Sequence, residues 1–327
     1  MDLYTYLARP SRLGLATTLG TSVVALVLCL AFEFVVPAQS DHLASYLGQK
    51  SFNLRSIIFY ATAGGVHILL CAAGIIFFSL QMRSAEPKLE LKNITIGIII
   101  GFCVVFGIVI LACKLDVNLV QQSYQDRIAP LQQDGRLASL LAERTIPFLG
   151  LKFQPLALFP LLLVAFGVAV AVVACFWIAH KAIEFVNRAD DLKKQHIVEM
   201  KRSVAQLITL ISIIFATSTL ATIGLMQIGR DWIEKGAARD GYIQNGDAMS
   251  MFWSAGYTCS IGAIVLIPLC WIAGYTKRIQ RQARYAGGRA SFYDHIYEVI
   301  SLRGVSQAGA AMLAPVLTSA IAAVLGS

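Results

Sequence analysis

The sequence predicts an all-α polytopic membrane protein with about six transmembrane helices. Of its 327 residues, 57% are hydrophobic and only 14% are charged, whereas soluble domains average roughly 25% charged residues. The charged residues cluster between apolar runs, several of which exceed the roughly 18 residues that indicate a transmembrane helix. No alternating segments of about 10 residues, typical of a membrane β-barrel, are present. These features exclude a soluble enzyme, a disordered chain, a disulfide scaffold and a coiled coil.

Six apolar runs are each long enough to cross about 30 Å of hydrocarbon as a helix. They cover about 14–36, 57–80, 93–113, 156–180, 205–228 and 250–275. Residues 1–276 therefore form the predicted transmembrane domain, and residues 277–327 contain a basic tract and C-terminal helices. The first run is too long for a signal peptide and contains Glu33, so we expect a retained anchor.

The segments between the runs also carry helix signals. Residues 114–155 predict a helical extension of the third span that breaks at Pro130, then a short helix near 136–144 and an apolar end at 146–151 resting on the membrane. In the segment 181–204, Glu184 with Arg188 and Asp190 with Lys194 have the i, i+4 spacing that supports a helix. We therefore expect spans four and five to project into the cytoplasm as a helical hairpin.

The C-terminal region predicts two further helices. Ser291 to Asp294 fit a capping box, and Gly304 is a typical helix stop. Residues 305–326 carry no charge, are rich in Ala and contain Pro315. We favour a cytoplasmic helix that packs against the spans or in an oligomer, and a seventh span is the alternative.

The positive charges predict the orientation. The N-terminus, the segments 81–92 and 181–204, and the tail together hold seventeen of the 27 Lys and Arg residues, and the other segments hold ten. Since cytoplasmic loops are enriched in Lys and Arg, both termini should be cytoplasmic. We expect an integral, multi-pass protein of the bacterial inner (plasma) membrane.

Two ionisable residues, Glu33 and His67, lie inside predicted spans. Such groups are costly in hydrocarbon and usually face the bundle interior or water. Either residue is a candidate proton or cation site. The alternative for His67, which we favour, is a neutral ring hydrogen-bonded to a Ser, Thr or carbonyl. Glu33 ends a stripe of Thr18, Ser22, Ala25 and Cys29 that faces protein or water, and its alternative is contact with the outer interface.

Span five carries a stripe of hydroxyls within an arc of about 140°. Its members are Thr209, Ser212, Thr219 and Thr222. These hydroxyls either hydrogen-bond within the bundle or form a pore wall, since neutral hydroxyls hydrate ions without trapping them. In span three, Gly97 and Gly101 predict a close helix contact.

A basic tract follows span six and includes two tyrosines but no acidic residue. Its cations are Lys277, Arg278, Arg281, Arg284 and Arg289. We expect them to bind anionic lipid head groups at the inner face, at about 1 kcal/mol per charge. A cytoplasmic anionic ligand is the alternative.

No motif of an enzyme, a metal site or a cofactor site is present, and the seven cysteines form no CxxC pair. We therefore predict no enzyme activity, no cofactor and no bound metal. The hydroxyl stripe and the small-residue faces favour a homo-oligomeric channel, gated from the cytoplasmic side by an anionic ligand or lipid. The alternatives are a proton- or cation-coupled secondary transporter and a non-conducting membrane scaffold.

Overall fold

The computed structural model describes residues 3–35, 55–85, 88–114, 144–146, 151–153, 155–187, 194–228, 236–285 and 313–326. Within them, six helices are long and apolar enough to cross a membrane. They are α2 (Pro10–Val35), α3 (Arg55–Ala85), α4 (Lys88–Lys114), α8 (Pro155–Asn187), α9 (Lys194–Gln227) and α10 (Ala237–Tyr285). All six predicted spans are therefore confirmed as helices.

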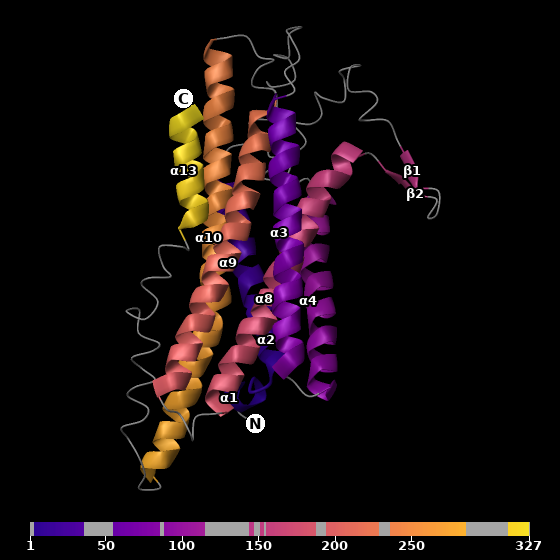
Figure 1. The fold of residues 1–327 in the computed structure, drawn as a ribbon. Helices are drawn as coiled ribbons and strands as arrows, with labels where there is room; N and C mark the ends of the chain where they lie inside the picture. Colours follow the sequence, from indigo (N-terminus) through magenta and orange to yellow (C-terminus); the bar gives the residue numbers. More distant parts are fainter. Residues whose placement is uncertain are drawn as a thin grey trace.

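The six helices run alternately up and down in one bundle (Figure 1). The short helix α1 (Leu3–Tyr6) lies at one end, which we call the N-terminal end; the other is the distal end. Helix α8 is central and contacts α2, α3, α4, α9 and α10. Every residue from 172 to 180 in α8 is buried, as expected of a helix that is apolar on all sides.

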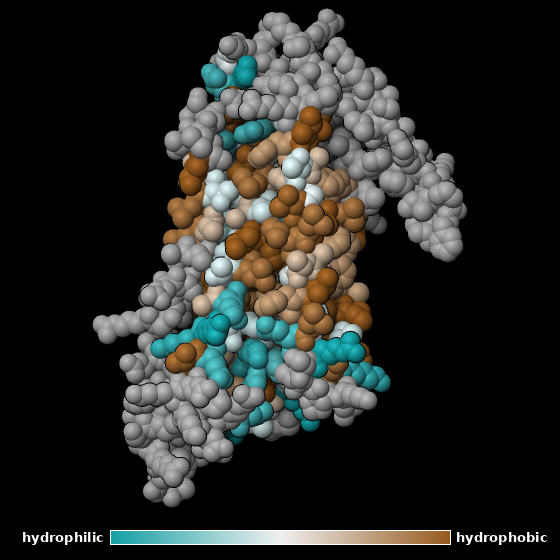
Figure 2. All heavy atoms as spheres, viewed as in Figure 1, coloured by the Kyte–Doolittle hydropathy of each residue, from teal (hydrophilic) through white to brown (hydrophobic). Residues whose placement is uncertain are grey.

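The outer surface of the bundle is apolar. Large exposed side chains include Val23 of α2, Leu69 of α3 and Ile99 of α4. Figure 2 shows this apolar belt above a band of hydrophilic residues at the N-terminal end. An exposed apolar surface of this extent suits contact with lipid rather than water.

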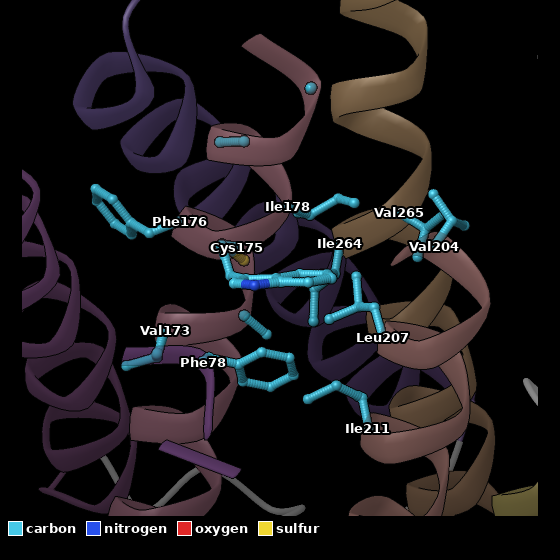
Figure 3. Packing of buried hydrophobic residues seen from close by; sticks show 14 of the residues in the cluster. Phe78, Val173, Cys175, Phe176, Ile178, Val204, Leu207, Ile211, Ile264 and Val265 are labelled. Atoms are coloured by element: carbon cyan, nitrogen blue, oxygen red, sulfur yellow. The ribbon is translucent and has the colours of Figure 1, made fainter. Parts of the chain in front are cut away.

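The largest core cluster lies toward the N-terminal end and centres on Trp177, which is fully buried. The Trp177 ring lies 5.2 Å from Phe78, and its Nε1 donates a hydrogen bond of 2.8 Å to Gln81 Oε1. Residues from α3, α8, α9 and α10 converge here (Figure 3). We call this group the Trp177 core: Phe78, Cys175, Phe176, Trp177, Ile178, Val204, Leu207, Ile208, Ile211, Ile264 and Val265.

Glycines allow close helix contacts around this core. A Cβ at Gly97 of α4 would lie 2.7 Å from the Phe176 ring, and one at Gly101 would lie 3.2 Å from Val172. Both glycines therefore lie where α4 packs on α8. This is the helix-packing role that the sequence suggests for the pair.

The elements between the spans differ partly from expectation. Residues 181–187 and 194–204 are helical, which confirms the predicted continuation of spans four and five. Helix α10 begins at Ala237, so residues 237–249, which precede the sixth predicted span, are also helical. Strands β1 (Arg144–Ile146) and β2 (Leu151–Phe153) pair antiparallel, with Arg144 opposite Phe153. The prediction of a helix near 136–144 is therefore wrong at residue 144, which begins a strand because the β-branched Thr145 and Ile146 favour that conformation. Residues 115–143 lie outside the described part of the structure.

The C-terminal helix α13 (Ala314–Gly326) contacts α9 and α10. In Figure 1 its end lies toward the distal end of the bundle, away from the N-terminus. This position differs from the favoured prediction of a cytoplasmic tail at the same end as the N-terminus; the alternative was a seventh span. Its 13 residues measure about 20 Å, too short to cross about 30 Å of hydrocarbon. The predicted helix at 291–304 lies outside the described residues.

Candidate functional site

His67 lies in α3, faces α9 and is only 1% exposed. Its Nδ1 lies 3.1 Å from the carbonyl oxygen of Ile214 and 3.3 Å from Thr217 Oγ1. A carbonyl oxygen only accepts hydrogen bonds, and the backbone of Leu163 in α8 is a second hydrogen-bond partner of the ring, so backbone acceptors of α8 and α9 both face the imidazole. This arrangement corresponds to the hydrogen-bonded alternative favoured by the sequence.

The other side of the His67 ring faces a thiol and α8. Cys71 Sγ lies 3.4 Å from Nε2, one helical turn along α3, and is within hydrogen-bonding range of the ring. A Cβ on Gly167 of α8 would lie 3.6 Å from the same nitrogen. The ring therefore lies between α3, α8 and α9, and a change in its protonation would change the contacts between these helices.

A group of hydroxyls lies beside His67, between α9 and α10. Ser218 Oγ donates a hydrogen bond of 3.0 Å to the Tyr257 hydroxyl, and the Thr222 hydroxyl is within hydrogen-bonding range of the same oxygen. The Tyr257 ring also packs on Phe215 at 5.2 Å. We call His67, Cys71, Thr217, Ser218, Thr222 and Tyr257 the central polar cluster.

The polar groups continue from Tyr257 toward the distal end. Ser250 and Ser254 of α10 are buried, and their hydroxyls donate to the carbonyls of Gly246 and Ser250. Each hydroxyl oxygen keeps lone pairs for a further partner. We call Ser250, Ser254, Tyr257, Ser218 and Thr222 the hydroxyl seam of the α9–α10 interface. Toward the N-terminal end, the same interface contains the apolar Trp177 core.

A small pocket lies at the distal end of the hydroxyl seam. It is lined by residues of α9 and α10 that include Gln227, Tyr242, Asp247 and Ser250. Its volume of about 10 Å³ is enough for about one water molecule. The Tyr242 hydroxyl donates to the carbonyl of Ile228 and joins the two helix ends.

A thin apolar layer lies beside this pocket. Met226 and Met249 are buried against Leu225, Phe252 and Trp253, and Met226 also lines the pocket. We call these five residues the methionine layer. Because methionine side chains are unbranched and adaptable, this layer can change shape more easily than the Trp177 core.

The four hydroxyls predicted to line a pore do not share one surface. Thr209 is exposed, Ser212 and Thr219 are buried, and Thr222 is half-buried. Thr219 donates to the Phe215 carbonyl at 3.0 Å and Thr222 donates to the Ser218 carbonyl at 2.9 Å. Ser212 Oγ has no hydrogen-bond partner among the described residues. Of the four, only Thr222 belongs to the central polar cluster.

The sequence did not identify six residues of the site: Cys71, Thr217, Ser218, Ser250, Ser254 and Tyr257. For three of them the spacing contained a signal, since Ser250, Ser254 and Tyr257 lie at i, i+4 and i+7 on one helical face. Cys71 likewise follows His67 by four residues, but only the fold brings Thr217 to the same ring.

The remaining predicted residues lie away from this site. In the stripe on α2, Thr18 is buried and donates to the Gly14 carbonyl at 3.0 Å, whereas Ala25 is exposed. Among the described side chains of the stripe, the change from buried to exposed lies between Thr18 and Ala25. The side chains of Cys29 and Glu33 lie outside the described part of the structure.

The basic tract begins on the last turns of α10, at the N-terminal end. Lys277 is exposed, and Arg278 donates a hydrogen bond of 3.2 Å to Thr5 Oγ1. Helix α10 continues through Arg281 and Arg284, whose side chains, together with the whole of Arg289, lie outside the described part.

Within the residues that the structure describes, no three His, Cys, Asp or Glu residues come together as metal ligands. The chain matches no protein-family model, no curated protein and no solved structure. The geometry of the bundle is therefore the basis for a functional proposal.

Proposed function

We propose that this protein is a proton-coupled secondary transporter, in which His67 is the proton-carrying group. The observation that carries this proposal is the position of His67 at the boundary between two kinds of interface. Hydroxyls lie on its distal side, and the apolar Trp177 core lies on its N-terminal side. Buried ionisable groups within membrane spans commonly belong to proton relays.

The contacts of His67 link its proton to the packing of helices. A neutral ring donates only one hydrogen bond, although the backbones of Ile214 in α9 and Leu163 in α8 are both its partners. When the second nitrogen takes a proton, the ring donates from both nitrogens and can bond to both helices at once. Protonation therefore favours a different arrangement of α3 against α8 and α9, as coupled transport requires.

The packing of the Trp177 core argues against a permanently open path through one chain. Trp177, Phe176 and Ile178 are completely buried, and Leu207 and Ile211 are each 1% exposed. A dry layer of this kind excludes water and ions. Passage through one chain therefore requires a rearrangement of this layer, which is typical of transporters that open alternately to the two sides.

The proposed orientation places the N-terminal end in the cytoplasm. This end carries an excess of basic side chains, which favours the cytoplasmic face. They include Arg9, Arg12, Arg83, Lys92, Lys181, Lys201, Arg202, Lys277 and Arg278. Anionic lipid head groups are the partners that such a surface would attract.

A test that requires no known substrate is to open the Trp177 core. In vesicles with a potassium diffusion potential and an internal pH dye, Trp177→Ala should allow a proton flux that is small in the wild type. Lowering the barrier by only about 1.4 kcal/mol raises a flux about tenfold. Leu207→Ala, at the same core, is a second variant in case loss of the Trp177 ring prevents folding.

The matched control adds His67→Asn to the Trp177→Ala protein. An asparagine amide can still donate to the Ile214 carbonyl, but it binds no proton near neutral pH. The flux should therefore return to the wild-type level. A flux of equal size with and without His67 would show that His67 carries no proton, and folded core variants that remain proton-tight would also contradict the proposal.

The homo-oligomeric channel is a second candidate, and the exposure of Thr209 favours it. This hydroxyl lies on the outer surface of α9, where a second copy of the chain could complete a polar path. A channel of this kind would conduct ions in wild-type vesicles under a suitable stimulus, such as an anionic lipid. Thr209→Trp would block that current, whereas His67→Asn would leave it unchanged.

A further inference from the structure

We propose that the hydroxyl seam between α9 and α10 is the route by which hydrated protons reach His67 from the distal end. This inference rests on the proposed function and deepens it, because it names the side and the residues of proton access. The species taken up at the pocket is a hydronium ion or the water that carries its proton.

On the face of α10 that packs on α9, the buried side chains change from polar to apolar at one position along the helix. Ser250, Ser254 and Tyr257 follow one another along this face, and Ile261, Ile264 and Val265 continue it. The change occurs at Tyr257, whose partner Ser218 is adjacent in sequence to Thr217, the neighbour of His67. The polar part of the interface therefore ends at the level of the proposed proton site.

The distal pocket lies at the outer end of this seam. Ser250 lines the pocket and is also the first hydroxyl of the seam, and Asp247 is a further lining residue. From Ser250 to Tyr257 the rise along α10 is about 10 Å. Because the Ser250 and Ser254 hydroxyls donate to carbonyls of their own helix, water molecules between the side chains carry the proton over this distance, and the hydroxyl lone pairs accept hydrogen bonds from that water.

The two barriers on either side of His67 are unequal. On the distal side, the described apolar packing beside the pocket is the methionine layer around Met226 and Met249. On the N-terminal side, it is the larger Trp177 core, with residues from α3, α8, α9 and α10. Because the thinner and more adaptable layer opens more easily, His67 exchanges protons with the distal side in this conformation.

Cysteine accessibility to Ag⁺, a small thiol-reactive cation, tests this route. Ser254→Cys and Val265→Cys are a matched pair, since both positions lie on the same face of α10 and are 0% exposed. In full-length protein lacking the seven native cysteines and reconstituted in vesicles, Ag⁺ is added on the distal side and the unreacted thiol is counted after denaturation. We expect position 254 to react at least about tenfold faster than position 265, because local opening controls access.

Ser250→Cys, at the pocket, is the second reporter if Ser254→Cys does not fold, and Met226→Ala should accelerate the reaction at position 254. Equal rates at positions 254 and 265, or faster reaction at 265, would overturn the proposed route. If position 254 is protected while His67→Asn still abolishes the flux of Trp177→Ala, the route is wrong and the proton-carrying role of His67 stands. If position 254 reacts and the flux is insensitive to His67→Asn, the seam conducts water but the transporter proposal fails.

Discussion

Gly224 tests the contact between α3 and α9 that holds His67 against its carbonyl partner. A Cβ at this position would lie 2.9 Å from the Cα and 3.0 Å from the backbone nitrogen of Tyr60. Since backbone atoms cannot rotate away, Gly224→Ala must push the two helices apart by several tenths of an ångström. Overpacking of this kind costs about 1–3 kcal/mol, whereas replacing a mid-helix glycine by alanine contributes about 1 kcal/mol in favour of the helix.

The control is Gly256→Ala in α10, where no atom of another described element lies within 4 Å of the added Cβ. Both variants gain the same helix propensity, so the difference between them isolates the overpacking cost. At about 2–4 °C per kcal/mol for a chain of 150–250 residues, we expect Gly224→Ala to melt on the order of 5 °C below Gly256→Ala. Fluorescence-detected unfolding in detergent measures this difference. Equal melting temperatures would refute the close α3–α9 contact.

Two further predictions concern the N-terminal end. A methyl group from Gly274→Ala would overlap the Tyr4 ring, so α1 should leave α10. Trp271 should then lose its hydrogen bond to the Tyr4 carbonyl, and the fluorescence of Trp271 should shift. An unchanged spectrum would contradict this contact. Gln81→Leu removes the acceptor of the buried Trp177 Nε1 and should lower the free energy of unfolding by about 1–3 kcal/mol. Its melting temperature should be lower than that of Gln81→Glu, which keeps an acceptor. Equal stability of the two variants would argue against this hydrogen bond.

The six spans were predictable because long apolar runs are recorded directly in the sequence. Their ends were less so, since Asp240 and Asn245 lower the hydropathy of the first turns of α10 although the helix continues through them. The position of the C-terminal helix was not predictable either. An uncharged helix fits either an oligomer or the side of the bundle, and only its contacts with α9 and α10 distinguish these possibilities.

The candidate site was predictable only in part. His67 stood out because an ionisable group in an apolar run is rare. Its main partner, the Ile214 carbonyl, is 147 residues away, and a backbone carbonyl leaves no mark in the sequence. The stripe on span five was assigned from helical periodicity alone, which identifies the residues on one face but not the neighbour of that face. Thr209 and Thr222 therefore fell into one stripe, although the fold leaves Thr209 exposed and brings Thr222 to Tyr257.

The most direct test of the account is the protonation of His67 itself, measured by nitrogen-15 NMR of histidine-labelled protein in lipid nanodiscs. The chain has five histidines, and comparison with His67→Asn identifies the signals of His67. We expect a neutral ring with a proton on one nitrogen at neutral pH, and a ring with protons on both nitrogens after acidification while the bundle stays folded. A ring that keeps its single proton at every pH at which the protein remains folded would contradict the proton-carrying role of His67.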